Sequence, residues 1–200
     1  MPYWFPDTTV LRNFAAVRQT SLLFEVLGND GRCVQAIDRE IKDAVTVVGY
    51  DDLRQVVEGQ LLGTPIEIDD ITDILLVQRI RVDELGGLRT EPRENLGEAE
   101  TIFVLRTDRT YAGSFWVTDD AAAYDFGRRS GLRTMCTRDV VAVAVHQGLI
   151  GLQDGFDLLT RMGTRQRVLA YTPTSSIDLE RWVNHWASEL LDDPASGEVP

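Results

Sequence analysis

The feature that most constrains the fold is an alternation of short apolar segments with amphipathic ones. The apolar segments have the composition of buried strands and lie at residues 3–5, 33–35, 113–118 and 132–136. Helical spacing of apolar residues follows them at 8–15, 36–44, 121–129 and 140–147. Strands that alternate with helices predict a parallel sheet with helices on both faces. We therefore expect an α/β fold with three layers, α/β/α.

The rest of the chain is read from periodicity and from turn residues. Helices are predicted at 20–27, 51–60 and 96–105, and residues 149–191 are expected to be mostly helical. Residues 71–80 are apolar enough for a buried helix or a buried strand, and periodicity does not decide between them. Residues 86–95 read as a loop, and 192–200 as a frayed tail. We expect one domain over 1–191, with the motif-bearing part at about 3–150.

Composition excludes several classes of protein. The 200 residues are 44% hydrophobic and 26% charged, which is typical of one soluble globular domain. The two cysteines, Cys33 and Cys136, form no C-x-x-C pair, which argues against a disulfide scaffold or a cysteine zinc site and fits the cytoplasm. We expect no signal peptide and no membrane span.

The net charge of −12 is open to two interpretations. An acidic protein repels nucleic-acid phosphates unless cations or a local basic patch intervene. The charge therefore serves solubility alone, or it serves to hold a basic partner or divalent metal ions.

Acidic residues stand where predicted strands end. Asp7 follows the first strand, and Asp119 and Asp120 follow the strand at 113–118; Glu40 and Glu98 lie early in predicted helices. Ligands of open parallel sheets bind outside the carboxyl ends of the strands, so these side chains are expected to converge there.

A cluster of this kind needs a counter-charge. Two carboxylates ~5 Å apart repel by roughly 3 kcal/mol at an effective dielectric near 20, so they bind protons or a cation. Mg²⁺ and Mn²⁺ prefer oxygen ligands, and a carboxylate-held pair activates water for phosphodiester cleavage. The alternative is that Asp7 and Asp119–Asp120 simply cap helices. Spacing alone leaves both interpretations open.

Three stretches resemble the PIN-domain family, in particular the ribonuclease toxins of bacterial toxin–antitoxin pairs. They are D-T-T-V-L-R-N-F-A at 7–15, L-G-E-A-E-T-I at 96–102 and W-V-T-D-D-A-A-A at 116–123, the last followed by S-G-L-R-T-M-C-T at 130–137 and H-Q-G-L-I at 146–150. Their order and spacing agree with the family over roughly residues 3–150.

The resemblance implies a PIN-like fold and an endoribonuclease that depends on Mg²⁺ or Mn²⁺. It also implies an RNA substrate and a cognate antitoxin protein, and a symmetric homodimer is the default expectation. Transferred by position, the catalytic and metal-binding residues are Asp7, Glu40, Glu98 and Asp120, with Asp119 as the other candidate of the T-D-D motif, Thr8 and Thr118 in support, and Asp38 and Glu100 as alternatives to Glu40 and Glu98.

Two positions depart from the family pattern. Tyr124 stands where an arginine is usual, and Cys136 stands where a glycine is usual. Arg128 and Arg129 follow one turn later and are candidate contacts for RNA phosphates. The departures affect substrate specificity more than the reaction.

Several other residues carry weaker signals. His146 and His185 fall in predicted helices and read as structural or surface residues rather than as part of a Ser-His-Asp site. Trp182 and Trp186 are predicted to pack one helix face, with base stacking as the alternative. The basic residues Arg161, Arg165 and Arg167 either meet RNA phosphates or solvate a helix end.

Two further functions compete with the ribonuclease. One is a catalytically silent PIN-like module whose acidic groove binds a basic partner. The other is a receiver-like domain that accepts a phosphoryl group on an aspartate; it is disfavoured because every basic residue after Val117, apart from the two histidines, is an arginine.

Overall fold

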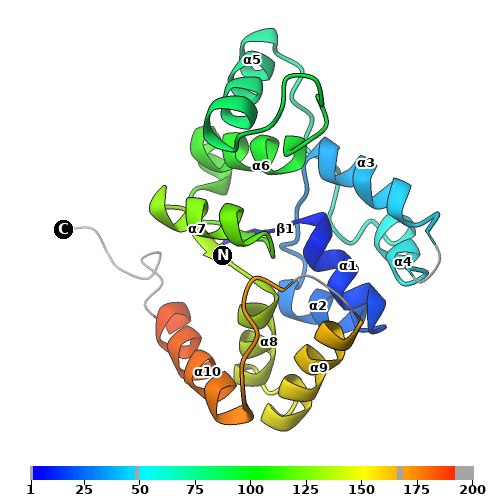
Figure 1. Cartoon of the computed structure of the whole chain (residues 1–200), viewed down its shortest axis with the longest axis vertical. Coiled ribbons are helices and arrows are strands. Elements are labelled where there is room, and N and C mark those ends of the chain that lie inside the picture. The colour runs from blue at the N-terminus through cyan, green and yellow to red at the C-terminus, as the bar shows by residue number, and fades with distance from the viewer. Residues whose placement is uncertain (1, 48–49, 166–168, 192–200) are drawn as a thin grey trace.

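Three short parallel strands form the centre of the protein, which we describe from a computed structural model (Figure 1). The structure describes residues 2–47, 50–165 and 169–191. The strands are β1 (Trp4–Pro6), β2 (Phe115–Val117) and β3 (Arg133–Met135), in the order β1-β2-β3. In register, Phe5 lies beside Trp116, and Trp116 lies beside Thr134. The predicted α/β class and the parallel sheet are confirmed.

The strand predicted at 33–35 does not form. Instead, single parallel bridges join Trp4 to Gly31 and Val34 to Ile66. The Arg32 amide donates to the Trp4 carbonyl at 2.8 Å, and the Ile66 amide donates to the Cys33 carbonyl at 2.9 Å. Residues 31–34 thus lie along the free edge of β1. The chain enters α3 at Gln35, so the extended segment is too short to form a continuous strand ladder with β1.

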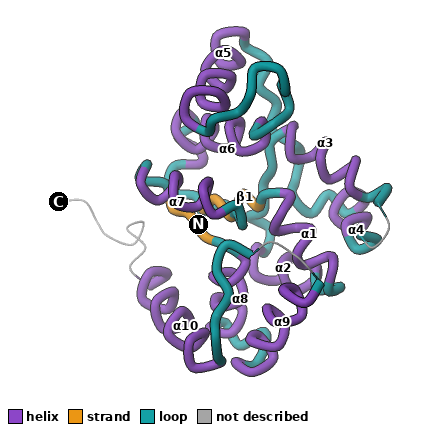
Figure 2. Tube along the Cα trace, in the orientation of Figure 1, coloured by secondary structure: helices purple, strands orange, loops and turns teal. Residues whose placement is uncertain are grey.

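Helices enclose these strands (Figure 2). In chain order they are α1 (Thr8–Ala16), α2 (Thr20–Leu27), α3 (Gln35–Ala44), α4 (Leu53–Glu58), α5 (Ile71–Arg79), α6 (Leu96–Thr107), α7 (Ala121–Arg129), α8 (Thr137–His146), α9 (Leu152–Thr164) and α10 (Ser176–Leu191). In Figure 1 the strands lie between α5 and α6 above and α8, α9 and α10 below, an arrangement compatible with three α/β/α layers.

Large apolar side chains of the strands form the middle of the core. Phe5, Phe115 and Trp116 are buried, and Phe14 of α1 packs into the same cluster. The last helix belongs to this core as well, because Trp186 of α10 is buried with its ring 6.3 Å from Phe115. The predicted tail at 192–200 lies outside the described residues.

The ambiguous segment 71–80 is helical over Ile71–Arg79 and continues as a short π-helix, Ile80–Glu84. Asp70 caps α5, because its carboxylate accepts from the backbone amides of Thr72 and Asp73. The expectation that this segment is buried is wrong. Ile71 is 68% exposed and Leu75 is 63% exposed, since α5 packs on α6 along one face only.

The helix predicted to begin at Val140 begins earlier, at Thr137. Asp139 causes the difference: its carboxylate accepts from the backbone amide of Cys136 at 2.9 Å and so fixes the cap. Cys136, the residue at this cap, is fully buried. In the described part of the chain, no helix is both long and apolar enough to cross a membrane.

Candidate active site

The candidate site lies at the carboxyl end of β1. On one side of β1 are residues 31–34, reached through α1 and α2; on the other side is β2, which comes much later in the chain. The connections therefore diverge at β1, and such a switch point leaves a crevice beyond the strand ends. Asp7 is the first residue after β1 and stands at this point.

Asp7 is a buried carboxylate that accepts hydrogen bonds from Thr8, from Thr118 and from the side chain of Thr9. Its Oδ1 accepts from the Thr8 amide at 2.6 Å, which makes Asp7 the N-cap of α1. Its Oδ2 lies 3.4 Å from the Thr118 hydroxyl, which donates to it. Burial, the charge of Glu40 and, to a lesser extent, Asp119 raise the pKa of Asp7 to about 6. Asp7 therefore caps α1 and also lies within electrostatic range of Glu40.

Glu40 reaches the same place from α3. The Thr8 hydroxyl donates to Glu40 Oε2 at 2.7 Å, so Thr8 links Asp7 to Glu40. Burial raises the pKa of Glu40, while the Thr8 hydrogen bond and the Arg12 charge oppose that rise.

Gly97 brings α6 against α3 at Glu40. A Cβ on Gly97 would lie 2.4 Å from Ile37 Cδ1 and 3.3 Å from Glu40 Oε1. Only glycine allows the two helices this separation, and the next residue, Glu98, is thereby placed at the site.

The pKa of Glu98 departs further from its ordinary value than the pKa of Asp7 does. Its pKa rises to about 8, first because the side chain is buried and then because Asp7, Glu40 and Asp120 repel its charge. A pocket of about 280 Å³ opens beside it, lined also by Asp120, Phe126 and Arg129. Glu98 thus connects the buried Asp7–Glu40 pair to an open surface.

The two neighbouring aspartates after β2 differ in burial and in their hydrogen-bond partners. Asp120 is exposed, and its Oδ1 caps α7 by accepting from the Ala123 amide at 2.8 Å. The second oxygen of Asp120 accepts no hydrogen bond from the described residues, and Asp120 lines the pocket shared with Glu98.

Asp119 is fully buried and saturated with donors. Its Oδ2 accepts from Asn13 Nδ2 at 2.6 Å and from the Thr137 hydroxyl, and its Oδ1 accepts from the amides of Thr137 at 3.1 Å and Ala170 at 3.4 Å. These bonds tie α1, α8 and the segment before α10 to the end of β2. They fit a positioning role for Asp119 better than the role of metal ligand considered from the sequence.

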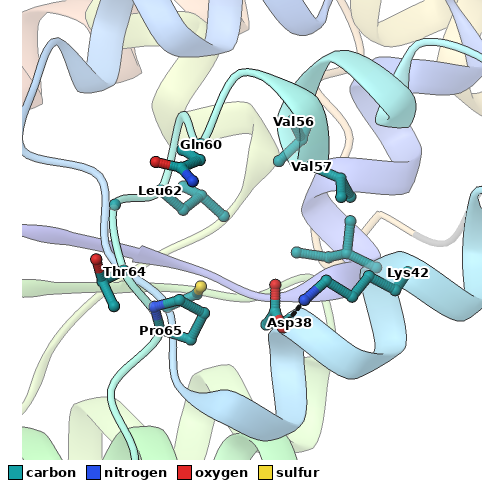
Figure 3. A pocket seen from close by; sticks show the side chains of 11 residues that line it. Asp38, Lys42, Val56, Val57, Gln60, Leu62, Thr64 and Pro65 are labelled. Atoms are coloured by element: carbon teal, nitrogen blue, oxygen red, sulfur yellow. Dashed lines mark hydrogen bonds and ion pairs between the residues drawn. The ribbon is translucent and has the colours of Figure 1, made fainter.

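The alternatives to Glu40 and Glu98 point elsewhere. Asp38 forms an ion pair with Lys42 at 2.6 Å, and both line a separate pocket of about 160 Å³ between α3 and α4 (Figure 3). Glu100 accepts from the Ala36 amide at 2.9 Å and so supports the start of α3. Neither side chain lines the pocket of Glu98 and Asp120, although burial and, to a smaller extent, the charge of Glu40 raise the pKa of Glu100.

Arg128 and Arg129, expected together as RNA contacts, separate around α7. Arg129 lines the pocket of Glu98 and Asp120, whereas Arg128 lines a larger pocket between α7 and α10. Adjacent helical residues point about 100° apart, and this rotation divides the pair.

Three functional neighbours escaped the sequence reasoning. Arg12 lies near Glu40, one helical turn after Thr8; Asn13 and Thr137 hold Asp119. The i, i+4 spacing of Thr8 and Arg12 on α1 is a signal that would have found Arg12. No local signal identifies Asn13 or Thr137, because they meet Asp119 only through the packing of α1 and α8.

The donor set has the chemistry of a site for a hard divalent cation. All four acids, Asp7, Glu40, Glu98 and Asp120, offer oxygen, and burial raises the pKa of the first three; repulsion within this set adds to the rise at Asp7 and at Glu98. Within the described residues, however, no three acidic, histidine or cysteine side chains are gathered closely enough to hold one ion together. Mg²⁺ commonly uses one or two carboxylates and retains several waters, which this arrangement satisfies.

Comparison with known proteins adds no relative: no family model, curated protein or solved structure matches this chain.

Proposed function

We propose that this protein is a metal-dependent endoribonuclease with a PIN-like fold, similar to the toxins of toxin–antitoxin pairs. The observation that supports it is that Asp7, Glu40 and Asp120, from three separate segments near the switch point of a parallel sheet, each raise the pKa of Glu98 by charge repulsion. A cation bound there would relieve that repulsion.

The residues around the candidate site would have different roles in such a reaction. Asp7 and Glu40 are held by Thr8, and Glu98 and Asp120 face the pocket where a phosphodiester would enter. When bound, Mg²⁺ or Mn²⁺ would neutralise charge and activate a water for hydrolysis of the phosphodiester to a 5′-phosphate and a 3′-hydroxyl. Arg129, in the same pocket, offers a donor for a phosphate oxygen.

The test compares matched carboxylate variants. Asp7→Asn and Glu98→Gln are expected to slow Mn²⁺-dependent cleavage of a labelled RNA by at least about a hundredfold, because several kcal/mol of transition-state stabilisation are lost. Asp38→Asn, on α3 but facing the pocket of Figure 3, should leave the rate unchanged. Absence of cleavage by the unchanged protein, or equal loss in all three variants, overturns the proposal.

Metal binding is tested without activity. Mn²⁺ is expected to raise the melting temperature of the unchanged protein, and Asp7→Asn and Glu98→Gln should abolish that rise. A rise that survives in both variants places the ion elsewhere.

A silent interaction module is the second candidate. It is favoured by the same observation that weakens the first: three ligands for one ion are not gathered in the described residues. In that case the acidic groove binds a basic segment of a partner protein. Arg12 of this chain already places a positive charge near Glu40, which supports the view that the site accommodates a cationic side chain. A metal-independent complex with a poly-arginine peptide, lost in Glu98→Gln, would support this function.

A protein partner or a second copy is supported by the exposed face of α5. Ile71, Ile74 and Leu75 have the i, i+3, i+4 spacing of one helix face, and each is exposed. Exposed apolar side chains that gather on one face are characteristic of protein contacts. The homodimer, the antitoxin and the cytoplasmic location stay predictions.

A further inference from the structure

A pocket separate from the one beside Glu98 is formed by α7, α8, α10 and Tyr171. Its volume is about 700 Å³, within the range that holds a small organic ligand. Aromatic and arginine side chains dominate its lining: Tyr124, Arg128, Arg138, Tyr171, Arg181 and Trp182. This combination is the one that binds a nucleobase by stacking and a phosphate by charge.

The aromatic side of the pocket is fixed before any ligand arrives. The Arg138 guanidinium lies 3.5 Å from the ring centre of Trp182 and 5.0 Å from that of Tyr171. Arg138 itself is buried and paired with Asp139 at 3.0 Å. The rings therefore rest on a rigid, charge-balanced base, and a stacked ligand loses little side-chain entropy to them.

The charged rim is different in kind. Arg128 and Arg181 are exposed, and within the described residues neither forms an ion pair. In a protein with a net charge of −12, two such cations at one pocket favour a local anion.

Two aspartates also line the pocket and define which ligand fits. Asp125 accepts from the Tyr171 hydroxyl at 3.2 Å, and Asp178 accepts from the Thr174 amide at 3.0 Å. Each retains acceptor capacity for an N–H group. A plain anion is disfavoured by these carboxylates, whereas a phosphate joined to a base with an exocyclic amine suits both halves of the lining.

We propose that this pocket binds one nucleotide, with its base on Trp182 and Tyr171 and its phosphate on Arg128 and Arg181. The chemistry is shared by a free mononucleotide and by one residue of a single-stranded RNA. The RNA source rests on the proposed ribonuclease function, and α7 supplies the link between the two sites. Asp120 caps its first turn and Arg128 lies in its last, about 12 Å along the helix.

The binding test uses the full chain in EDTA, so that neither metal nor cleavage enters. Tryptophan fluorescence is titrated with AMP, GMP, CMP and UMP, with ribose 5-phosphate, and with a short single-stranded RNA. The amine-bearing nucleotides should bind at least about tenfold more tightly than ribose 5-phosphate, which lacks the base. An RNA that binds more tightly than every mononucleotide identifies RNA as the source, and equal affinities identify the free nucleotide.

Variants locate the site. Trp182→Ala and Arg181→Gln are each expected to weaken AMP binding about tenfold, and Trp182→Phe should retain most of it. Trp182 also packs within the fold, so its alanine variant could lose binding through instability. Arg181 is exposed, and Arg181→Gln should therefore fold normally and test the pocket independently. The matched control is Arg161→Gln, an exposed arginine on α9 outside the pocket, which should bind as the unchanged protein does.

Three results overturn the proposal. One is the absence of nucleotide binding, and another is binding that is unchanged in Arg181→Gln and Trp182→Ala alike. The third is occupation of the pocket by an acidic peptide in preference to AMP. The outcome is separable from the ribonuclease proposal, because Glu98→Gln removes cleavage and should leave AMP binding in EDTA intact.

Discussion

The carboxylates at the carboxyl edge of the sheet differ in what satisfies their oxygens. Asp119 accepts from Asn13, Thr137 and Ala170 and is enclosed by protein donors. Asp7 and Glu40 share Thr8, and the charges of both raise the pKa of Glu98. A buried acid with every lone pair filled serves the fold, whereas a group of acids short of donors is available to a ligand.

The largest expected effect is on stability at Asp119. Asp119→Ala should lower the free energy of unfolding by about 3 kcal/mol, because it leaves Asn13 and Thr137 buried without their acceptor. Its neighbour gives the matched control: Asp120→Ala removes only a helix cap and should cost about 1 kcal/mol. Urea unfolding at pH 7 measures both, and equal costs would end the distinction between the two aspartates.

Above neutral pH, Glu98→Gln should raise the free energy of unfolding, whereas Asp119→Ala lowers it. Glu98 binds its proton more tightly in the folded protein, with a pKa of about 8 against an ordinary value of 4.5. The favourable contribution of Glu98 to the free energy of unfolding is fully present below about pH 4.5 and is lost as the pH rises through 8. The variant should therefore be more stable than the unchanged protein at pH 9, by about 2 kcal/mol, and similar to it at pH 4.5.

Thermal unfolding across this pH range checks the Glu98 prediction. Glu58→Gln, an exposed glutamate on α4, is the control and should follow the unchanged protein. A variant that is destabilised at every pH would show that Glu98 is satisfied by donors in the way Asp119 is.

Gly97→Ala tests whether the approach of α6 to α3 builds the acidic cluster. The added methyl would collide with Ile37, so the variant should lose about 2 kcal/mol of stability and bind Mn²⁺ more weakly. Gly163→Ala in α9 meets no atom within 4 Å and should gain up to about 1 kcal/mol through helix propensity. Chemical unfolding and Mn²⁺ titration give the two readouts; unaltered Mn²⁺ affinity in Gly97→Ala would separate the helix contact from the site.

The smallest effect is expected at Asp38. Its ion pair with Lys42 lies at the surface of α3, so Asp38→Ala should change stability by no more than about 0.5 kcal/mol. Two residues further along the same helix, Glu40→Ala should remove the Mn²⁺-induced rise in melting temperature. Calorimetry of both variants with and without Mn²⁺ decides whether α3 has one functional carboxylate or two.

The sequence predicted most of the elements because their signals are local. Asp7, Asp70 and Asp120 cap α1, α5 and α7 through hydrogen bonds within three residues, and such caps can be read from neighbours in the chain. The failure at 33–35 has a different origin. Whether three extended residues pair as a strand depends on β1 and on Ile66, which contribute only single bridges.

The alternation of strands and helices, and the acids that follow the strands, could be predicted from local sequence alone. Which member of each neighbouring pair lies at the candidate site depends on the tertiary structure: Asp120 rather than Asp119, Glu40 rather than Asp38, and Arg129 apart from Arg128. The reason is geometric. One or two positions along a helix or a strand end turn a side chain to another face, and what occupies that face comes from distant parts of the chain.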